Sequence, residues 1–229
     1  MTWLDDFISL IFPRICACCG NSLWKHEEII CHSCDFRLPR TNFHLDADNP
    51  VARLFWGRAP VEAAGAYLYF NKGNRVQRLV HQLKYKGRKD IGAWLGNQYG
   101  HELLKSSLFS NLDAIIPVPL HKKRYMQRGY NQSEQFAIGL GKPMNLPVVN
   151  HLLTRSRATE TQTRKSRFSR YQNVHDIFEV IHAEKYKGKH LLLVDDVITT
   201  GATLESSVLA LAAIPGVKIS VACIAAAVL

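Results

Sequence analysis

The sequence has no apolar run that approaches the ~20 residues of a membrane-spanning helix, so we expect no membrane span. Its first residues lack both a basic leader and a small-residue cleavage site, and they include Asp5 and Asp6. This argues against a signal peptide and predicts a cytoplasmic protein. Acidic residues are also few, because 19 Asp and Glu stand against 29 Lys and Arg, a formal net charge of +10. The excess favours polyanionic partners, either nucleic acid or phosphorylated ligands.

Apolar residues, in contrast, are sufficient for a packed core. The chain has 229 residues, 47% of them hydrophobic, which allows one α/β domain with a small appendage. The expected parts are a module at 1–45 that begins with a helix at 3–12, a linker at 46–60 and a main domain at 61–229. The linker is predicted from its Asp, Asn and Pro residues and its weak periodicity.

Four of the six cysteines form two pairs, Cys16 with Cys19 and Cys31 with Cys34, each with two residues between its members. Four thiolates at this spacing can close a tetrahedron around Zn²⁺. A structural zinc would supply folding energy that about 40 residues do not obtain from a core. Disulfides are disfavoured in a cytoplasmic protein, which leaves a redox-active pair as the alternative.

Three further side chains bear on the choice of zinc ligands. Cys18 lies inside the first pair, and Cys16 with Cys19 is favoured over it because two intervening residues suit a chelating turn. His26 and His32 are candidate substitutes, although a histidine at such a place is more often simply exposed.

A second polar group follows a short apolar run near the C-terminus. Residues 191–194 predict a buried strand, and Asp195 and Asp196 are expected where that strand leaves the sheet. The small residues of the following turn are Thr199, Thr200, Gly201, Ala202 and Thr203, and a helix is expected at 204–213. Converging N–H groups, hydroxyls and a helix dipole describe a cradle for a phosphate dianion. The two carboxylates fit a ligand that also presents sugar hydroxyls or Mg²⁺. An ordinary strand–turn–helix connection with an acidic cap is the plainer alternative.

Two stretches concentrate positive charge. A buried strand at 114–119 ends in prolines and leads into a predicted loop at 121–132. The basic residues of this loop are Lys122, Lys123, Arg124 and Arg128, which are costly to place together unless an anion lies nearby. The second stretch, 152–170, has almost no apolar content and includes Arg155, Arg164, Lys165 and Arg167. We expect a mobile loop that runs into a basic helix ending near Asn173, and the loop either closes over a polyphosphate or follows a nucleic-acid backbone.

Apolar periodicity predicts most of the remaining elements. Strands are expected at 61–70, 176–180 and 217–229, and helices at 76–83, near 91–104 and at 133–140. Asn74 is the expected cap of the helix at 76–83. Basic residues on the other positions of this helix, among them Lys84, are expected to be solvated.

The acid pair and the threonine turn resemble the phosphoribosyl pyrophosphate loop of type I phosphoribosyltransferases. The resemblance implies that Asp195 and Asp196 hold ribose hydroxyls, directly or through Mg²⁺, and that residues 199–203 hold the 5-phosphate. It also implies an α/β fold with a parallel sheet flanked by helices, in which the basic loop at 121–132 faces the pyrophosphate.

Taken in order, the motifs of the whole chain resemble the ComF/GntX family. They are the two cysteine pairs, Leu-Lys-Tyr-Lys-Gly at 83–87, Pro-Val-Pro-Leu at 117–120, Arg-Gly-Tyr-Asn-Gln at 128–132, Leu-Thr-Arg at 153–155, Thr-Gln-Thr at 161–163, Arg170 with Asn173, and the acid–threonine loop. The resemblance implies a phosphoribosyltransferase-like domain and a role in handling internalised single-stranded DNA, in natural competence or in the use of external DNA. Proteins of DNA uptake or recombination are the partners that such a role implies.

Two functions stay open at this point. In the first, the chain is a phosphoribosyltransferase whose basic loop neutralises the leaving pyrophosphate. No general base stands out for it, and its acceptor is not identified. In the second, the chain is a non-catalytic DNA-binding or adaptor protein that uses the same site to sense a ligand or to hold DNA phosphate.

Overall fold

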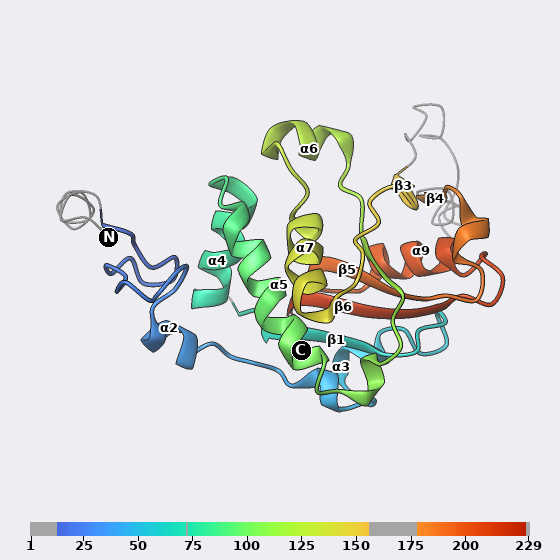
Figure 1. Cartoon of the computed structure of the whole chain (residues 1–229), viewed down its shortest axis with the longest axis horizontal. Coiled ribbons are helices and arrows are strands. Elements are labelled where there is room, and N and C mark those ends of the chain that lie inside the picture. Colours follow the sequence, from blue (N-terminus) through green and yellow to red (C-terminus); the bar gives the residue numbers. More distant parts are fainter. Residues whose placement is uncertain (1–12, 72, 156–177, 228–229) are drawn as a thin grey trace.

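A four-stranded parallel sheet forms the centre of the fold (Figure 1). The computed structural model describes residues 13–71, 73–155 and 178–227. The strands are β1 (Ala64–Tyr69), β2 (Ala114–Pro117), β5 (His190–Ile198) and β6 (Lys218–Ala226), and they lie in the order β1-β6-β5-β2. Every neighbouring pair in this order is parallel. The predicted α/β class with a parallel sheet is thereby confirmed.

Helices cover both faces of this sheet (Figure 1). They are α3 (Pro50–Arg53), α4 (Arg75–Tyr85), α5 (Lys89–Leu103), α7 (Gln132–Met144) and α9 (Ala202–Leu211). Leu192 and Val194 of β5 belong to the apolar cluster of α4, α5 and α7. Leu191 and Leu193 belong to the cluster of α3 and α9. The alternation of side chains along a strand therefore buries β5 on both faces, as its apolar run predicted.

Helix α4 begins and packs as its sequence indicates. The Asn74 side chain accepts a hydrogen bond from the N–H of Gln77 at 3.0 Å and so caps the helix. The apolar stripe at positions 76, 79, 80 and 83 is fully buried. Burial of this stripe fixes the helix against the sheet and determines which of its polar residues face the sheet edge.

Helices α5 and α7 approach each other closely because glycines line their contact. A Cβ atom at Gly96 would stand 2.2 Å from the carbonyl oxygen of Phe136, and one at Gly139 would stand 2.1 Å from that of Ala93. The two backbones therefore touch where side chains would otherwise hold the helices apart. This contact fixes the position of α7, whose first turn lies beside the acid pair.

The segment 46–60, expected to be a linker, packs against the sheet. It contains α3, which Asn49 caps by accepting hydrogen bonds from the N–H groups of Val51 and Ala52. Val51 and Phe55 are buried in the same apolar cluster as α9. The segment thus contributes side chains to the core of the main domain.

The basic segment predicted to be a loop at 121–132 is largely a helix, α6 (Lys122–Arg128). His121 accepts a hydrogen bond from the N–H of Lys123 at 3.2 Å, and Gly129, with φ of 73°, ends the helix. The prediction was wrong here because no residue of α6 is buried. Such a helix has no apolar stripe by which periodicity could reveal it.

The smaller elements complete the fold. They are α2 (His32–Phe36), the antiparallel pair β3 (Leu153–Arg155) and β4 (Phe178–Val180), and 3-10 helices at Phe43–Leu45, Ser107–Phe109 and Ala183–Tyr186. The helix predicted at 3–12 and most of the basic stretch 152–170 lie outside the described residues. Within the part of the chain that the structure describes, no helix combines the length and apolar character needed to cross a membrane.

Candidate functional site

The acid pair lies where one strand of the sheet stops before its neighbour. Strand β2 pairs with β5 only as far as Pro117 and Val194, whereas β6 stays paired with β5 up to Ile198. Asp195 and Asp196 come directly after the last residue that β2 covers. They were predicted where β5 leaves the sheet, but β5 continues past them to Ile198. The shorter β2 opens the carboxyl edge of the sheet at this point, the usual place for ligands in open α/β sheets.

Two side chains from the helices contact these carboxylates. The Ser133 hydroxyl, in the first turn of α7, donates to Asp195 Oδ1 at 2.8 Å. Lys84 Nζ, in the last turn of α4, lies 2.9 Å from Asp196 Oδ2. The side chains of Lys84 and Asp196 are only 21% and 14% exposed. Other ion pairs of the described residues, such as Arg88 with Asp90, each have a partner that is 40% exposed or more.

The carboxyl group of Asp195 titrates near neutral pH. Burial, together with the charge of Asp196, raises the pKa of Asp195 to about 7, although the Ser133 hydroxyl and Lys84 act in the opposite direction. Two adjacent carboxylates in a partly closed site resist double ionisation. A ligand that brings hydroxyl donors or a cation stabilises the ionised pair, so the site favours ligands of that kind.

The turn after the acid pair opens a hollow of about 50 Å³, lined by Asp195 and residues 197–204. All five residues predicted to hold phosphate line it: Thr199, Thr200, Gly201, Ala202 and Thr203. Gly201 has φ of 77° and is the N-cap of α9. Because no side chain caps α9, the first N–H groups of the helix keep their donors for a ligand. These donors and the helix dipole suit an anion.

The basic residues of α6 divide into two sets. Arg124 and Arg128 line a cavity of about 510 Å³ with Lys84, Tyr85, Gly87 and Gln127. The Arg128 guanidinium donates to Gln132 Oε1 at 2.7 Å and lies 5.3 Å from the centre of the Tyr85 ring. Lys122 and Lys123 are exposed and do not line this cavity. Only part of the predicted basic cluster therefore comes near the acid pair.

Arg155, at the end of β3, approaches the site from another direction. Its guanidinium lies 5.4 Å from the centre of the Phe178 ring. Burial and the positive charge of Arg124 lower the pKa of Arg155, and Asp195 opposes this shift. Arg155, Arg124 and Asp195 thus lie within electrostatic reach of one another. The predicted Arg164, Lys165 and Arg167 lie outside the described residues.

Sequence reasoning missed the two partners of the acid pair. Lys84 was expected to be solvated, yet it follows the buried Val80 by four positions, which places it beside the apolar stripe of α4. This spacing could have indicated that Lys84 lies beside the buried face of the helix. Ser133 carries no comparable signal, because only the packing of α7 on α5 brings its hydroxyl to the edge of the sheet.

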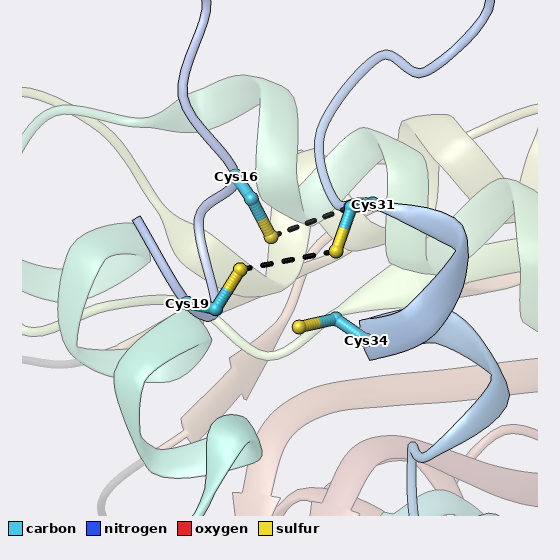
Figure 2. Close-up of side chains that lie close together, drawn as sticks. All are labelled: Cys16, Cys19, Cys31 and Cys34. Carbon is cyan, nitrogen blue, oxygen red and sulfur yellow. Dashed lines mark hydrogen bonds between the residues drawn. The ribbon is translucent and has the colours of Figure 1, made fainter. Parts of the chain in front are cut away.

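The four paired cysteines converge in the N-terminal module, as Figure 2 shows. Their sulfur atoms all lie within 4.8 Å of one another, and Cys19 Sγ lies 3.8 Å from Cys31 Sγ. A tetrahedral zinc with Zn–S bonds of about 2.3 Å requires sulfur atoms roughly 3.8 Å apart. The arrangement therefore fits a zinc ion held by Cys16, Cys19, Cys31 and Cys34.

Backbone geometry supports this choice of ligands. Cys16 Sγ accepts N–H groups from Cys18 at 3.4 Å and from Cys31 at 3.3 Å. Burial opposes ionisation of Cys16, but hydrogen bonds from the backbone outweigh it and lower its pKa to about 7. Cys18 is buried and lies outside the converging set, and burial raises its pKa. The predicted preference for Cys16 over Cys18 agrees with these contacts.

The two candidate histidines form a group of their own. His26 and His32 lie with Glu27, and one ligand atom of each residue comes within 4.8 Å of the others. The Glu27 carboxylate accepts N–H groups from Trp24 and His32, both at 2.8 Å, and so fixes the turn before α2. The four cysteines converge without either histidine.

The module contacts the main domain through α4. Arg78 donates to the carbonyl of Cys18 at 2.9 Å, and Gln82 donates to that of Ala17 at 2.6 Å. A cavity of about 690 Å³ lies along this contact. One helix therefore contacts the cysteine module with one part of its surface and the acid pair with another.

Comparisons with known proteins found a matching domain family and several relatives. The family described as "Phosphoribosyl transferase domain" matches residues 131–229. The chain is 30% identical to the DNA utilization protein YhgH of Escherichia coli O157:H7 over 193 residues. This match covers 83% of this chain and 80% of that protein. The chain is 38% identical over 94 residues to Competence protein F of Haemophilus influenzae, 41% of each chain. It is also 24% identical over 212 residues to Competence protein ComFC of Bacillus subtilis, 90% of this chain and 80% of that one. Among solved structures, the glutamine phosphoribosylpyrophosphate amidotransferase from B. subtilis is similar with a TM-score of 0.42 and 22% identity, over 62% of this chain and 30% of that one.

Proposed function

Because this chain belongs to the ComF family of proteins with a phosphoribosyltransferase-like domain, we propose that it binds phosphoribosyl pyrophosphate with Mg²⁺ at the acid pair. One observation carries the proposal. Asp195 and the turn at 199–203 line a single hollow at the carboxyl edge of the sheet, beside an uncapped helix, and Asp196 is the neighbour of Asp195 in the same strand. A sugar phosphate needs acceptors for its hydroxyls and donors for its phosphate, and this part of the chain supplies both.

Each part of the site has a role in this proposal. The N–H groups and hydroxyls of residues 199–203 hold the 5-phosphate, while the carboxylates of Asp195 and Asp196 accept the ribose hydroxyls. Arg124 and Arg128, across the neighbouring cavity, and Arg155 face the pyrophosphate. Bound Mg²⁺ supplies further neutralisation of the pyrophosphate oxygens.

A transferase reaction at this site would break the bond between the anomeric carbon and the pyrophosphate oxygen and form a bond from that carbon to the acceptor, with pyrophosphate as the leaving group. Negative charge then develops on the leaving group, and fixed positive side chains stabilise that charge best when they are in place beforehand. Arg128 meets this condition, because Gln132 and Tyr85 hold its guanidinium. The acceptor is the part of the reaction that activity measurements must identify.

The wider role that we propose is the handling of internalised single-stranded DNA in the cytoplasm. The names of the relatives, a DNA utilization protein and two competence proteins, support it. The net charge of +10 and the exposed basic surface of α6 suit a nucleic-acid backbone. Proteins of DNA uptake or recombination are the proposed partners.

A second candidate function is non-catalytic DNA binding or adaptor activity. It is favoured by Lys122 and Lys123, which are exposed on α6 and do not line the cavity with Arg124 and Arg128. The charges of Lys122 and Lys123 would not contact a small ligand in that cavity, so they are available to a larger polyanion such as DNA. In this role the phosphoribosyl site senses a ligand or holds a DNA phosphate.

The proposed zinc has a structural role. Cys16, Cys19, Cys31 and Cys34 would hold it, and the ion links the turn at Cys16 to the start of α2. The module then presents the carbonyl groups of Ala17 and Cys18 to α4.

Calorimetry with phosphoribosyl pyrophosphate and Mg²⁺ tests the binding site. The wild type is expected to bind, and the double variant Asp195→Asn/Asp196→Asn is expected to lose at least about tenfold in affinity. Asp46→Asn/Asp48→Asn, a pair of exposed acids that do not line the hollow, is the charge-matched control. Absence of binding to the wild type would refute the assignment.

Two measurements separate the enzyme from the adaptor. Release of pyrophosphate in the presence of a nucleobase or an amine supports the enzyme, whereas binding without release supports the adaptor. For DNA, Lys122→Ala/Lys123→Ala should lower the slope of log affinity against log salt by about 1.4, the value for two single-strand phosphates. An unchanged slope removes α6 from the DNA surface.

A further inference from the structure

Lys84 belongs to the Leu-Lys-Tyr-Lys-Gly motif at 83–87, but the proposed function gives it no role. Its ammonium lies 2.9 Å from Asp196 Oδ2, and this is a largely enclosed ion pair, in contrast to the exposed pairs elsewhere in the described residues. The other oxygen of Asp196 accepts the N–H of Val197 at 2.6 Å. The lysine therefore neutralises the same carboxylate that a sugar or a divalent cation would need.

Two cavities meet at this lysine. The first holds Arg124 and Arg128 and measures about 510 Å³. The second measures about 360 Å³ and reaches the threonine turn, because Val197 and Thr199 line it together with Lys84. Lys84 is common to both cavities and to the ion pair with Asp196. A short movement of its ammonium would take it from the carboxylate to either space.

The helix that carries Lys84 is held firmly, whereas the side chain has room to move. Leu83, the preceding residue, is fully buried, and its carbonyl accepts a hydrogen bond from the Tyr130 hydroxyl. Arg78 and Gln82 tie the same helix to the cysteine module. The lysine side chain is a flexible stem of four carbons, so the ammonium can change partners without movement of α4.

We propose that Lys84 is an exchangeable counter-ion of the acid pair. It neutralises Asp196 in this conformation, a divalent cation displaces it, and the released ammonium then contributes to binding of the pyrophosphate group beside Arg124 and Arg128. The proposal rests on the proposed function for the identity of the anion, but not for the competition between Lys84 and a cation.

This role predicts effects of opposite sign on cations and anions. Removal of the lysine charge leaves Asp196 free for a divalent cation, so cation affinity rises. The same change removes one positive charge from the wall of the anion cavity, so affinity for a polyphosphate falls. A lysine that merely supports the fold would shift both affinities in the same direction when it is replaced.

The test uses the zinc-loaded full chain and the variants Lys84→Met and Lys84→Arg, with Lys86→Met as the control for net charge. Binding of Mn²⁺ is followed by electron paramagnetic resonance, and binding of inorganic pyrophosphate without divalent metal by calorimetry. For Lys84→Met we expect Mn²⁺ binding about five- to twentyfold tighter and pyrophosphate binding about tenfold weaker. Lys84→Arg and Lys86→Met should stay within about twofold of the wild type for Mn²⁺. Far-ultraviolet circular dichroism confirms that all variants are folded.

Several results would overturn the inference. One is a change of both affinities in the same direction in Lys84→Met. Another is an equal effect of Lys86→Met, and a third is the absence of Mn²⁺ binding in both the wild type and Lys84→Met. Failure of the wild type to bind phosphoribosyl pyrophosphate would instead contradict the proposed function, while the Mn²⁺ comparison would still decide whether Lys84 competes with a cation.

Discussion

Replacement of Asp195 by asparagine should stabilise the protein while it impairs the proposed site. In the wild type, burial and the neighbouring Asp196 raise the pKa of Asp195 from 3.8 to about 7. Asparagine keeps an oxygen for the Ser133 hydroxyl and for the N–H of Asp196, which both contact Oδ1 at 2.8 Å. It removes the charge that the site disfavours, at little cost in packing.

The magnitude follows from the pKa shift. The rise of the Asp195 pKa from 3.8 to about 7 corresponds to about 4 kcal/mol as an upper value for the cost of ionising Asp195 in the folded state. Because the folded state binds the proton more tightly than the unfolded state, wild-type stability falls as pH rises from about 4 through 7. At pH 8 the asparagine variant should therefore be more stable by about 1–4 kcal/mol, and near pH 4 the difference should vanish.

Thermal unfolding of the zinc-loaded chain at pH 5 and pH 8 provides the assay. For a chain of this size, where 1 kcal/mol shifts Tm by about 2–4 °C, the gain corresponds to a rise in Tm of about 2–16 °C at pH 8 and less at pH 5. Asp46→Asn, at an exposed position, is the matched control and should change Tm little. An Asp195→Asn variant that is no more stable than the wild type at pH 8, or equally shifted at both pH values, would refute the reasoning. Gain of stability with loss of binding is typical of residues selected for a site.

Three further predictions follow from other parts of the structure. Affinity for phosphoribosyl pyrophosphate with Mg²⁺ should fall about tenfold between pH 8 and pH 6 as Asp195 is protonated, which calorimetry at both pH values will show. Metal analysis should find one zinc per chain in the wild type and in Cys18→Ser, but none in Cys31→Ser, which should also unfold at a lower temperature. Gly96→Ala should destabilise the protein by about 3 kcal/mol in thermal unfolding, because its Cβ would stand 2.2 Å from the carbonyl oxygen of Phe136.

Local sequence patterns predicted the elements that bury an apolar face. The stripe of α4, its cap Asn74 and the run at 191–194 each correspond to a helix, a cap or a strand of the structure. The convergence of the four cysteines was also predictable, because chelating turns are local and their spacing is visible in the sequence. These features depend on neighbours a few residues away.

Features that depend on distant contacts were not predictable in the same way. The extension of β5 beyond Val194 depends on pairing with β6, which is distant in the sequence. Helix α6 has no buried residue, so the sequence contains no apolar periodicity that would predict it. Ser133 reaches Asp195 across 62 positions of sequence, through the packing of α7 on α5. Lys84 shows the intermediate case, because its position beside the apolar stripe was visible while its partner Asp196 was not.

The central claim is that the hollow beside Asp195 accepts the phosphate group of a phosphorylated pentose, and a negative charge placed in it tests that claim most directly. Ala202, the first residue of α9, lines the hollow, and Ala213, beyond the other end of the helix, is exposed and serves as the control. Glutamate at the start of a helix favours the helix itself, so loss of folding does not confuse the result. Calorimetry with ribose 5-phosphate should show binding to the wild type and to Ala213→Glu, and a loss of about thirtyfold or more in Ala202→Glu. Equal binding to all three proteins, or none to the wild type, would contradict the claim.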